Sequence, residues 1–168
     1  MTIRPETEAD IAAIREVNEH AFDRPAEANL VVALRAGRKA IVSLVAEDAG
    51  SVIGHILFSP VTIEPDDKTL SAVGLAPMAV LPEYQNRGVG SRLVEAGLEA
   101  CRGGGYDCVV VLGYANYYPK FGFIPASRYG IKSEYDVADE VFMLIELRKG
   151  ALRNVSGIAR YQPEFNAV

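Results

Sequence analysis

The clearest chemical pattern in the sequence is a glycine-containing turn that stands directly before an amphipathic helix. The turn reads Gln85-Asn86-Arg87-Gly88-Val89-Gly90. Backbone N–H groups at the start of a helix have no intrahelical acceptor, and the helix dipole adds positive potential at that end. Glycine in such a turn lets a bulky anion approach the main chain closely. The pattern therefore predicts a binding site for a pyrophosphate group.

Two common nucleotide-binding motifs do not fit this turn. A dinucleotide fingerprint would need a third glycine where Leu93 stands, and a P-loop would need Gly-Lys followed by Ser or Thr. A structural interpretation stays open, in which Gly88 and Gly90 only allow the helix to pack tightly on a sheet.

A second candidate segment is rich in aromatic residues. It reads Asn116-Tyr117-Tyr118-Pro119-Lys120-Phe121-Gly122-Phe123. A tyrosine phenol has an ordinary pKa of about 10, so it is protonated at neutral pH and can donate a proton. The alternative is that these rings only pack in a core, which aromatic side chains do well.

The elements that must position the two segments can be predicted from hydrophobic patterning. The apolar stretch 70–81 reads as a strand, in which Gly74 and Pro77 indicate a bulge or a bend. After the turn, apolar or small residues recur at helical spacing; they are Leu93, Val94, Gly97, Leu98 and Cys101. Glycines at 103–105 end this helix, and the continuous apolar run 109–112 predicts a strand buried on both faces. The order strand, helix, strand indicates a parallel crossover.

The rest of the chain predicts further helices and strands. A capping box at Thr7 and Asp10 opens a helix that ends near Phe22, and a second helix runs from Ala26 to a stop at Gly37. The expected strands are residues 2–4, 41–47, 51–58, 141–147 and 156–168. A tight hairpin turn at 48–50 joins two of these strands, and a polar loop covers 64–68.

Length and composition are those of a single globular domain. The chain has 168 residues, of which 49% are hydrophobic and 23% charged, and its formal net charge is −5. We expect one domain over residues 1–168, with 148–168 as a tail whose structure the pattern leaves open. Scattered basic residues and a negative net charge argue against a nucleic-acid partner. The start of the chain is too polar for a signal peptide and no apolar run reaches about 18 residues, so we expect a cytoplasmic location and no membrane partner.

Cysteine and histidine residues give no sign of a metal site. Cys101 and Cys108 have no histidine close in the sequence, so neither a disulfide framework nor zinc is indicated, and buried inert thiols are expected. His20 and His55 each stand alone among apolar residues, and neither receives a role.

Together, the two segments resemble those of the GNAT superfamily of acyl-CoA N-acyltransferases. That family's cofactor signature, Gln/Arg-x-x-Gly-x-Gly/Ala, is matched by Gln85, Gly88 and Gly90, and residues 80–84 resemble its lead-in. The aromatic segment resembles the family's Tyr-x-x-x-Gly-Phe segment, with Tyr118 as the matching tyrosine. The resemblance covers about residues 2–147 in the order of elements. It implies an α+β fold, an α/β sandwich in which helices flank a mixed, splayed central sheet.

The resemblance also implies acetyl-CoA as the cofactor and direct transfer of its acetyl group to a primary amine in a ternary complex. Acetyl-CoA would lie between two parting strands of the sheet, with its pantetheine arm on backbone groups of Met78, Ala79 and Val80. Asn116 is a further expected contact with the cofactor. The residues expected to bind the cofactor at the turn are Gln85, Asn86, Arg87, Gly88, Val89, Gly90 and Ser91.

Tyr118 is the residue that the resemblance implies as general acid for the departing thiolate. Its neighbour Tyr117 would point elsewhere in a helical segment. The general base stays open, because relatives often use a carboxylate of the central strand and residues 71–75 contain none. The alternatives are a chain of water molecules or one of three carboxylates, Glu47, Glu64 and Glu83.

The acceptor and the assembly are left open by the sequence. The acceptor is expected to be an amine of a small molecule or of a protein, and a homodimer is one alternative for the assembly. An acidic stretch either attracts a cationic amine or is a solvated loop, which is the usual reading of such a run; its members are Glu134, Asp136, Asp139 and Glu140. Two rival functions remain: a regulatory domain that binds acyl-CoA without turnover, and an interaction domain that binds no nucleotide.

Overall fold

The computed structural model describes residues 1–65 and 69–168, which form two compact units. The first unit contains Met1–Ser59, Ala76–Glu99 and Pro163–Val168. The second unit contains Pro60–Leu75 and Ala100–Gln162. Residues 66–68, which belong to the loop expected at 64–68, lie outside the described residues.

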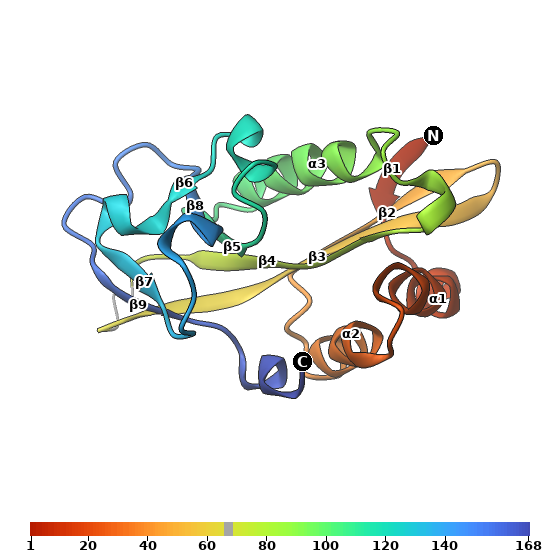
Figure 1. Ribbon diagram of the computed structural model, residues 1–168, viewed down its shortest axis with the longest axis horizontal. Coiled ribbons are helices and arrows are strands. Elements are labelled where there is room, and N and C mark those ends of the chain that lie inside the picture. The colour runs from red at the N-terminus through yellow and green to blue at the C-terminus, as the bar shows by residue number, and fades with distance from the viewer. Residues whose placement is uncertain (66–68) are drawn as a thin grey trace. The chain divides into compact units, whose positions relative to one another are not determined.

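The strands form a mixed sheet whose members are labelled in Figure 1. In the described residues it has nine strands in the order β1-β2-β3-β4-β5-β8-β6, and β9 pairs with β3 and β7. Their bounds are β1 Thr2–Pro5, β2 Val42–Asp48, β3 Ser51–Glu64, β4 Ala72–Val80, β5 Cys108–Leu112, β6 Ile124–Pro125, β7 Ile131–Ser133, β8 Phe142–Glu146 and β9 Gly157–Arg160. β4 and β5 pair in parallel, whereas β1 with β2 and β2 with β3 pair antiparallel. The mixed sheet predicted for an α+β fold is therefore confirmed.

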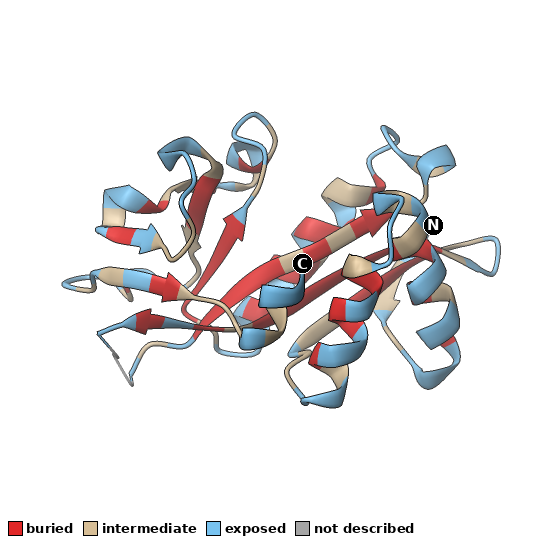
Figure 2. Cartoon of the chain, turned by 60° about the horizontal axis from the view of Figure 1, so that its bottom comes forward, coloured by how far each residue is buried: buried red, intermediate tan, exposed pale blue. Residues whose placement is uncertain are grey.

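In the first unit, helices cover both faces of the sheet (Figure 1). α1 (Ile11–Phe22) and α2 (Ala26–Ala36) lie on one face, and α3 (Val89–Gly103) lies on the other. Because successive strand residues point to opposite faces, Leu57 packs with α1 and α2, whereas Ile56 lies under α3. Figure 2 shows that each of α1 and α2 has a buried stripe and an exposed one. Within the described residues, none of the helices has the length and apolar character needed to cross a bilayer.

The hairpin between β2 and β3 has the tight turn that the sequence predicts. Asp48 pairs with Ser51, and the two residues between them, Ala49 and Gly50, have φ angles of 50° and 83°. Positive φ at both central residues matches the right-handed twist of the flanking strands. Gly50 adopts this conformation at little cost because it has no Cβ.

The second unit is organised around β5. Its residues Cys108–Leu112 pair with β8 along their whole length, whereas β5 pairs with β4 only from Ala72 to Gly74. The buried Asp107 fixes this arrangement, since its carboxylate accepts hydrogen bonds from Ser71 N–H at 2.8 Å and Arg148 Nε at 2.7 Å. One side chain thus holds the beginnings of β4 and β5 together with the segment that follows β8.

Two predicted strands need correction, and two short strands are absent from the prediction. The strand expected over 156–168 is wrong in its second half, where Pro163–Ala167 forms a 3-10 helix. Proline cannot donate to a strand ladder, and Phe165 packs instead against the core under α1 and α2. The strand expected over 70–81, with a bulge or a bend inside it, is instead one continuous strand of nine residues, Ala72–Val80. The short strands β6 and β7 were not predicted, because two or three residues show no periodicity.

The predicted capping box opens the 3-10 helix Glu8–Asp10, which leads directly into α1, and it carries an additional ion pair. Arg4 binds both carboxylate oxygens of Asp10, at 2.8 and 3.0 Å. One of these oxygens also accepts the backbone N–H of Thr7 at 2.7 Å. The hydrogen bonds from Arg4 are the main reason that the pKa of the buried Asp10 is held well below its usual range.

Replacing this carboxylate should destabilise the protein in a pH-dependent way. We expect Asp10→Asn to lower the free energy of unfolding by about 1–2 kcal/mol near neutral pH, because a cap and a charged hydrogen bond are weakened. The folded-state pKa lies below the unfolded value of about 4, so this stabilisation is present above that value and is lost as the pH falls. Urea unfolding at about pH 7 and about pH 3 should show the difference between wild type and variant shrinking. An equal difference at both pH values would contradict the ionic role.

Candidate functional site

The turn before α3 belongs to the first unit and is fastened to the end of β4. β4 ends at Val80, and the 3-10 helix Pro82–Tyr84 follows. Leu81 N–H donates to the carbonyl oxygen of Ile53 at 2.9 Å, which ties this end to β3. The side-chain amide of Gln85 donates to the Val80 carbonyl at 3.0 Å. The predicted Gln85 therefore bonds back to the strand end and holds the turn in shape.

Gly88 leaves an open position directly before α3. Its φ is 83°, and that of Asn86 is 62°. A Cβ atom added at Gly88 would meet nothing within 4 Å. Its carbonyl oxygen accepts the N–H of Arg92 at 3.1 Å, so the N–H groups of Val89 and Gly90 come before the first helical donor. The turn thus presents main-chain donors beside a place that no side chain fills, as a large anion requires.

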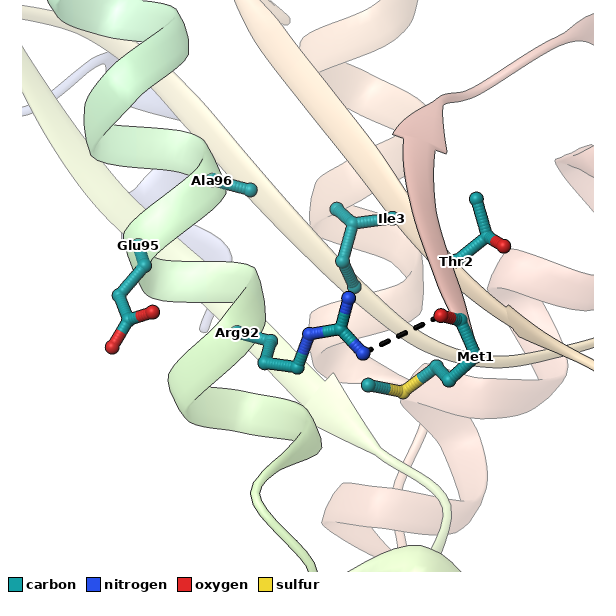
Figure 3. Close-up of a pocket in the computed structure, with 6 residues that line it drawn as sticks. All are labelled: Met1, Thr2, Ile3, Arg92, Glu95 and Ala96. Atoms are coloured by element: carbon teal, nitrogen blue, oxygen red, sulfur yellow. Dashed lines mark hydrogen bonds between the residues drawn. The ribbon is translucent and has the colours of Figure 1, made fainter.

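The two arginines near the turn have different surroundings. The guanidinium carbon of the exposed Arg87 lies 5.8 Å from the centre of the Tyr84 ring. Arg92 instead donates to the carbonyl oxygen of Met1 at 3.4 Å, as Figure 3 shows. This contact lies at a pocket of about 420 Å³ lined by Met1, Thr2, Ile3, Arg92, Glu95 and Ala96. None of the predicted cofactor residues lines that pocket. Arg92 is thus engaged away from the turn, and Arg87 is the arginine that belongs to it.

The three strand residues predicted to meet the cofactor are the last three of β4. Ala79 and Val80 are buried, and Met78 is half-buried. The carbonyl oxygen of Ala79 faces Gly54 of β3, where an added Cβ would lie 3.3 Å away. The structure therefore brings Met78, Ala79 and Val80 together with the turn, within the first unit.

The second unit contains the predicted tyrosine. Tyr118 begins a 3-10 helix, Tyr118–Phe121, and is 7% exposed. Its ring packs edge-on against Phe123, with 5.6 Å between ring centres. A Cβ atom on Gly113 would lie 2.4 Å from the Tyr118 ring, so only glycine there admits it. Burial, followed by the neighbouring Tyr117, raises the pKa of Tyr118 to about 12. Tyr118 is thus a buried phenol that keeps its proton throughout the neutral range.

The neighbours of Tyr118 face different surroundings. Tyr117 is half-buried and stands at 89° to the Tyr118 ring. The ammonium of Lys120 lies 4.1 Å from the centre of the Tyr117 ring, a cation–π contact. Asn116 is exposed. Of this segment, Tyr118 is the phenol that the fold buries, and Asn116 is the polar side chain left at the surface.

No general base stands out among the three carboxylates left open by the sequence. Glu47 accepts a hydrogen bond from Arg4 at 3.0 Å, and Glu64 accepts one from Arg160 at 2.6 Å. Both are therefore already engaged by a guanidinium. Glu83 is exposed on the 3-10 helix before the turn.

His55 is not isolated, as the sequence suggested, but belongs to a buried polar chain. Its Nε2 lies 2.9 Å from Ser43 Oγ and its Nδ1 lies 3.4 Å from the amide of Asn18. Ser43 also bonds to Glu6, which Arg35 holds at 2.9 Å. Because an ionised carboxylate only accepts, the Ser43 hydroxyl donates to it and His55 donates from Nε2. Burial, followed by the charge of Arg35, lowers the pKa of His55 to about 3, so the ring is neutral.

The remaining residues singled out by the sequence are partly in the interior and partly exposed to solvent. Cys101 and Cys108 are free and buried, and burial raises the pKa of both thiols to about 12. Of the acidic stretch, Glu134 is half-buried and paired: it binds Arg160 at 3.4 Å and the backbone N–H of Tyr161 at 3.0 Å. The other three residues are exposed, as expected for a solvated loop; they are Asp136, Asp139 and Glu140. His20 is also exposed.

Comparison with known protein families and proteins gives consistent matches. Residues 2–126 match the model of the acetyltransferase (GNAT) domain. The chain is 36% identical over 167 residues to the uncharacterized N-acetyltransferase YhbS of Escherichia coli, covering 99% of both chains. It is 43% identical over 136 residues to the uncharacterized N-acetyltransferase YjhQ of the same organism, covering 79% of this chain and 75% of YjhQ.

Two solved structures extend these matches to the fold. The crystal structure of YhbS from Escherichia coli in complex with CoA superposes with a TM-score of 0.93, covering 98% of this chain and 91% of that chain. A GNAT family acetyltransferase from Brucella melitensis in complex with acetyl-CoA gives a TM-score of 0.80 at 36% identity, covering 98% and 97% of the two chains.

Proposed function

Because the chain belongs to the GNAT acetyltransferase family, we propose that the turn at Gly88 binds the cofactor and that Tyr118 is the acid of its reaction. The chain is an acetyl-CoA-dependent N-acetyltransferase, and the relatives solved with CoA and acetyl-CoA support that cofactor. The observation that carries the assignment of residues is the open, left-handed Gly88 directly before α3.

The pyrophosphate of acetyl-CoA binds the first turn of α3. Its oxygens accept the backbone N–H groups of Val89, Gly90 and Ser91, and the charge of Arg87 adds to the positive helix end. Gln85 and Asn86 hold the turn in the conformation that exposes these donors. Backbone groups of Met78, Ala79 and Val80 carry the pantetheine arm, and Asn116 provides a further polar contact.

Acetyl transfer then needs a proton donor for the leaving thiolate. The nitrogen of a neutral amine attacks the thioester carbonyl carbon, the C–S bond breaks, and the leaving thiolate takes the proton of the Tyr118 hydroxyl. A pKa of about 12 keeps that proton in place until the thiolate forms. The amine nitrogen loses its surplus proton to water, since none of the three candidate carboxylates is singled out as a base.

The acceptor is a primary amine of a small molecule or of a protein. We place the reaction in the cytoplasm and expect residues 1–168 to act as one domain. Both expectations rest on the sequence, and screening amines with the purified protein is the direct route to the acceptor.

Cofactor binding at the turn can be tested by thermal unfolding with and without acetyl-CoA. At about a hundredfold excess over its Kd, a ligand stabilises the folded state by about 2.7 kcal/mol. We expect this stabilisation for the wild type and its loss in Gly88→Asp, because the new carboxylate repels the pyrophosphate. No stabilisation of the wild type at saturating acetyl-CoA would contradict the proposed site.

A matched control separates this effect from backbone strain. Gly50, in the hairpin between β2 and β3, has the same φ of 83° as Gly88 and the same free space around an added Cβ. Gly50→Asp therefore imposes a similar strain and the same charge at a site without cofactor. It should keep the full stabilisation by acetyl-CoA, and losing it equally in both variants would argue against a specific role of Gly88.

A further inference from the structure

Gly54 of β3 lies where this strand meets both parts of the proposed cofactor site. A Cβ atom placed on Gly54 would lie 3.0 Å from Cδ1 of Leu93 and 3.2 Å from Cγ1 of Val89, both on α3. These distances are shorter than the contacts of packed carbon atoms, which are about 3.5–4.0 Å. The same Cβ would lie 3.3 Å from the carbonyl oxygen of Ala79, near the end of β4. Because Gly54 has no side chain, β3, the beginning of α3 and the end of β4 come together at one point.

A β-bulge sets the place of Gly54 in the ladder between β2 and β3. Ala46 of β2 pairs with Gly54, whereas the next residue of β2 pairs with Val52, so one step along β2 faces two steps along β3. The additional residue is Ile53, whose carbonyl oxygen accepts the N–H of Leu81 at 2.9 Å. Bulges re-aim the residues of a strand and are frequent beside functional sites. Here the bulge holds the end of β4 by a hydrogen bond, and the residue after it receives α3.

The packing of α3 along β3 is complementary at two places. At one place the strand has the glycine, Gly54, and Val89 and Leu93 of the helix cover it. At the other place the helix has the glycine, Gly97, and an added Cβ would lie 2.4 Å from the ring of Phe58 on the strand. Val89 and Gly97 are eight residues apart on α3, a span of about 12 Å. Gly54 and Phe58 are four residues apart on β3, about 13 Å. The spans match, so both contacts form at once, and the contact at Gly54 is the one beside the turn.

Val89 connects this packing to the proposed binding site. It is the first residue of α3 and follows Gly88 directly. Its side chain is 4% exposed and packs at Gly54, while its backbone N–H is one of the donors proposed for the pyrophosphate. Hydrogen bonds to a charged oxygen depend on distance and angle. A group that pushes the Val89 side chain away from β3 therefore also moves this donor.

We propose that Gly54 is a positioning residue for acetyl-CoA binding, which seats α3 against β3 so that the donors of the turn and the end of β4 meet the cofactor together. The inference rests on the proposed cofactor site at Gly88. Gly54 acts through Val89 on one side and through the carbonyl of Ala79 on the other. A side chain at position 54 displaces these groups, so it weakens binding of the cofactor rather than the chemical step.

The first experiment measures the Kd of acetyl-CoA by isothermal titration calorimetry. Gly54→Ala should raise the Kd about tenfold, because a hydrogen bond to a charged oxygen is bent out of line. Gly104→Ala is the matched control, since an added Cβ there meets a ring carbon of Tyr106 at 3.0 Å and the carbonyl oxygen of Ala100 at 3.3 Å. It creates a similar overlap at a place without a proposed cofactor contact and should leave the Kd unchanged. An unchanged Kd in Gly54→Ala, or an equal rise in both variants, would overturn the proposal.

A double-mutant cycle tests whether the effect passes through Val89. Val89→Ala removes the Cγ1 that the new Cβ would meet and keeps the backbone N–H of residue 89. Leu93 meets the Cβ with a terminal methyl group, which turns aside more easily than the β-branched valine. In the Val89→Ala background, Gly54→Ala should therefore raise the Kd by no more than about threefold. A full tenfold rise in both backgrounds would contradict the proposed route.

Turnover with an amine found by screening supplies a second readout. In Gly54→Ala the KM for acetyl-CoA should rise, while kcat at saturating acetyl-CoA stays close to that of the wild type. A purely structural defect would lower the active fraction of the enzyme, and hence kcat, without changing the KM; that result would overturn the proposal. Failure of the proposed function looks different, because Gly88→Asp would then also bind acetyl-CoA with wild-type affinity.

Discussion

Tyr118→Phe is expected to lower kcat by a factor of about a hundred or more, while acetyl-CoA binding is retained. General acid catalysis contributes about 10²–10⁴-fold, and phenylalanine keeps the ring but has no proton to give. The ring contacts of Tyr118 with Phe123 and Gly113 do not involve its hydroxyl group, so the fold should persist. Initial rates at saturating acetyl-CoA, with the thermal shift by acetyl-CoA as the test of binding, measure both parts of the expectation.

Tyr117→Phe is the control for this variant. It removes a hydroxyl from the adjacent ring, which stands at 89° to that of Tyr118 and carries Lys120 on its face. Its effect on kcat should be far smaller. Because the pKa of Tyr118 is raised to about 12, wild-type activity should not fall through loss of this proton between about pH 7 and pH 10. Equal losses in the two variants, or full activity of Tyr118→Phe, would remove Tyr118 from the mechanism.

Gly97→Val is expected to cause the largest loss of stability, about 3 kcal/mol. Gly97 lies on the face of α3 that packs on β3, and an added Cβ would lie 2.4 and 2.6 Å from two ring carbons of Phe58. Phe58 is fully buried, so it cannot yield without disturbing its own neighbours. Overpacking of this kind costs about 1–3 kcal/mol, and valine's second branch enlarges the clash. Urea unfolding with and without the substitution measures the difference in free energy.

The same substitution at the end of α3 supplies the comparison. A Cβ at Gly103 would meet nothing within 4 Å, so Gly103→Val should change the free energy of unfolding by no more than about 0.5 kcal/mol. If Gly97→Val were equally mild, the contact with Phe58 would not limit how closely α3 approaches the sheet.

Features with a local cause were predictable from the sequence. A glycine pattern between an apolar stretch and a helical period predicts the turn at Gly88, and the structure gives Gly88 a left-handed backbone there. The hairpin at Ala49 and Gly50 has the same explanation. The capping box of Asp10 depends on residues only a few positions apart. In each case the interacting groups are neighbours in the chain, so their spacing carries the information.

Features built from distant residues were not predictable in this way. The polar partners of His55 come from Asn18 on α1 and Ser43 on β2, and no spacing rule links these positions. Tyr161 reaches Gly74 only because β9 pairs with β3 and β7. The pattern of the tail predicts a strand and does not reveal that Pro163–Ala167 leaves the ladder. Such contacts follow from the topology of the whole chain.

The two compact units are not consecutive along the chain, and this bears on the order in which they are completed during synthesis. Pro163–Val168 belongs to the first unit, yet every residue of the second unit precedes it. Lys39 binds Glu164 at 2.9 Å, and Phe165 packs against the same core as Leu34. The two partners of each contact are synthesised at very different times, and contacts between residues so far apart in the sequence slow folding. A nascent chain that ends before Pro163 contains every residue of the second unit. It still lacks the segment that packs against the buried side of α2.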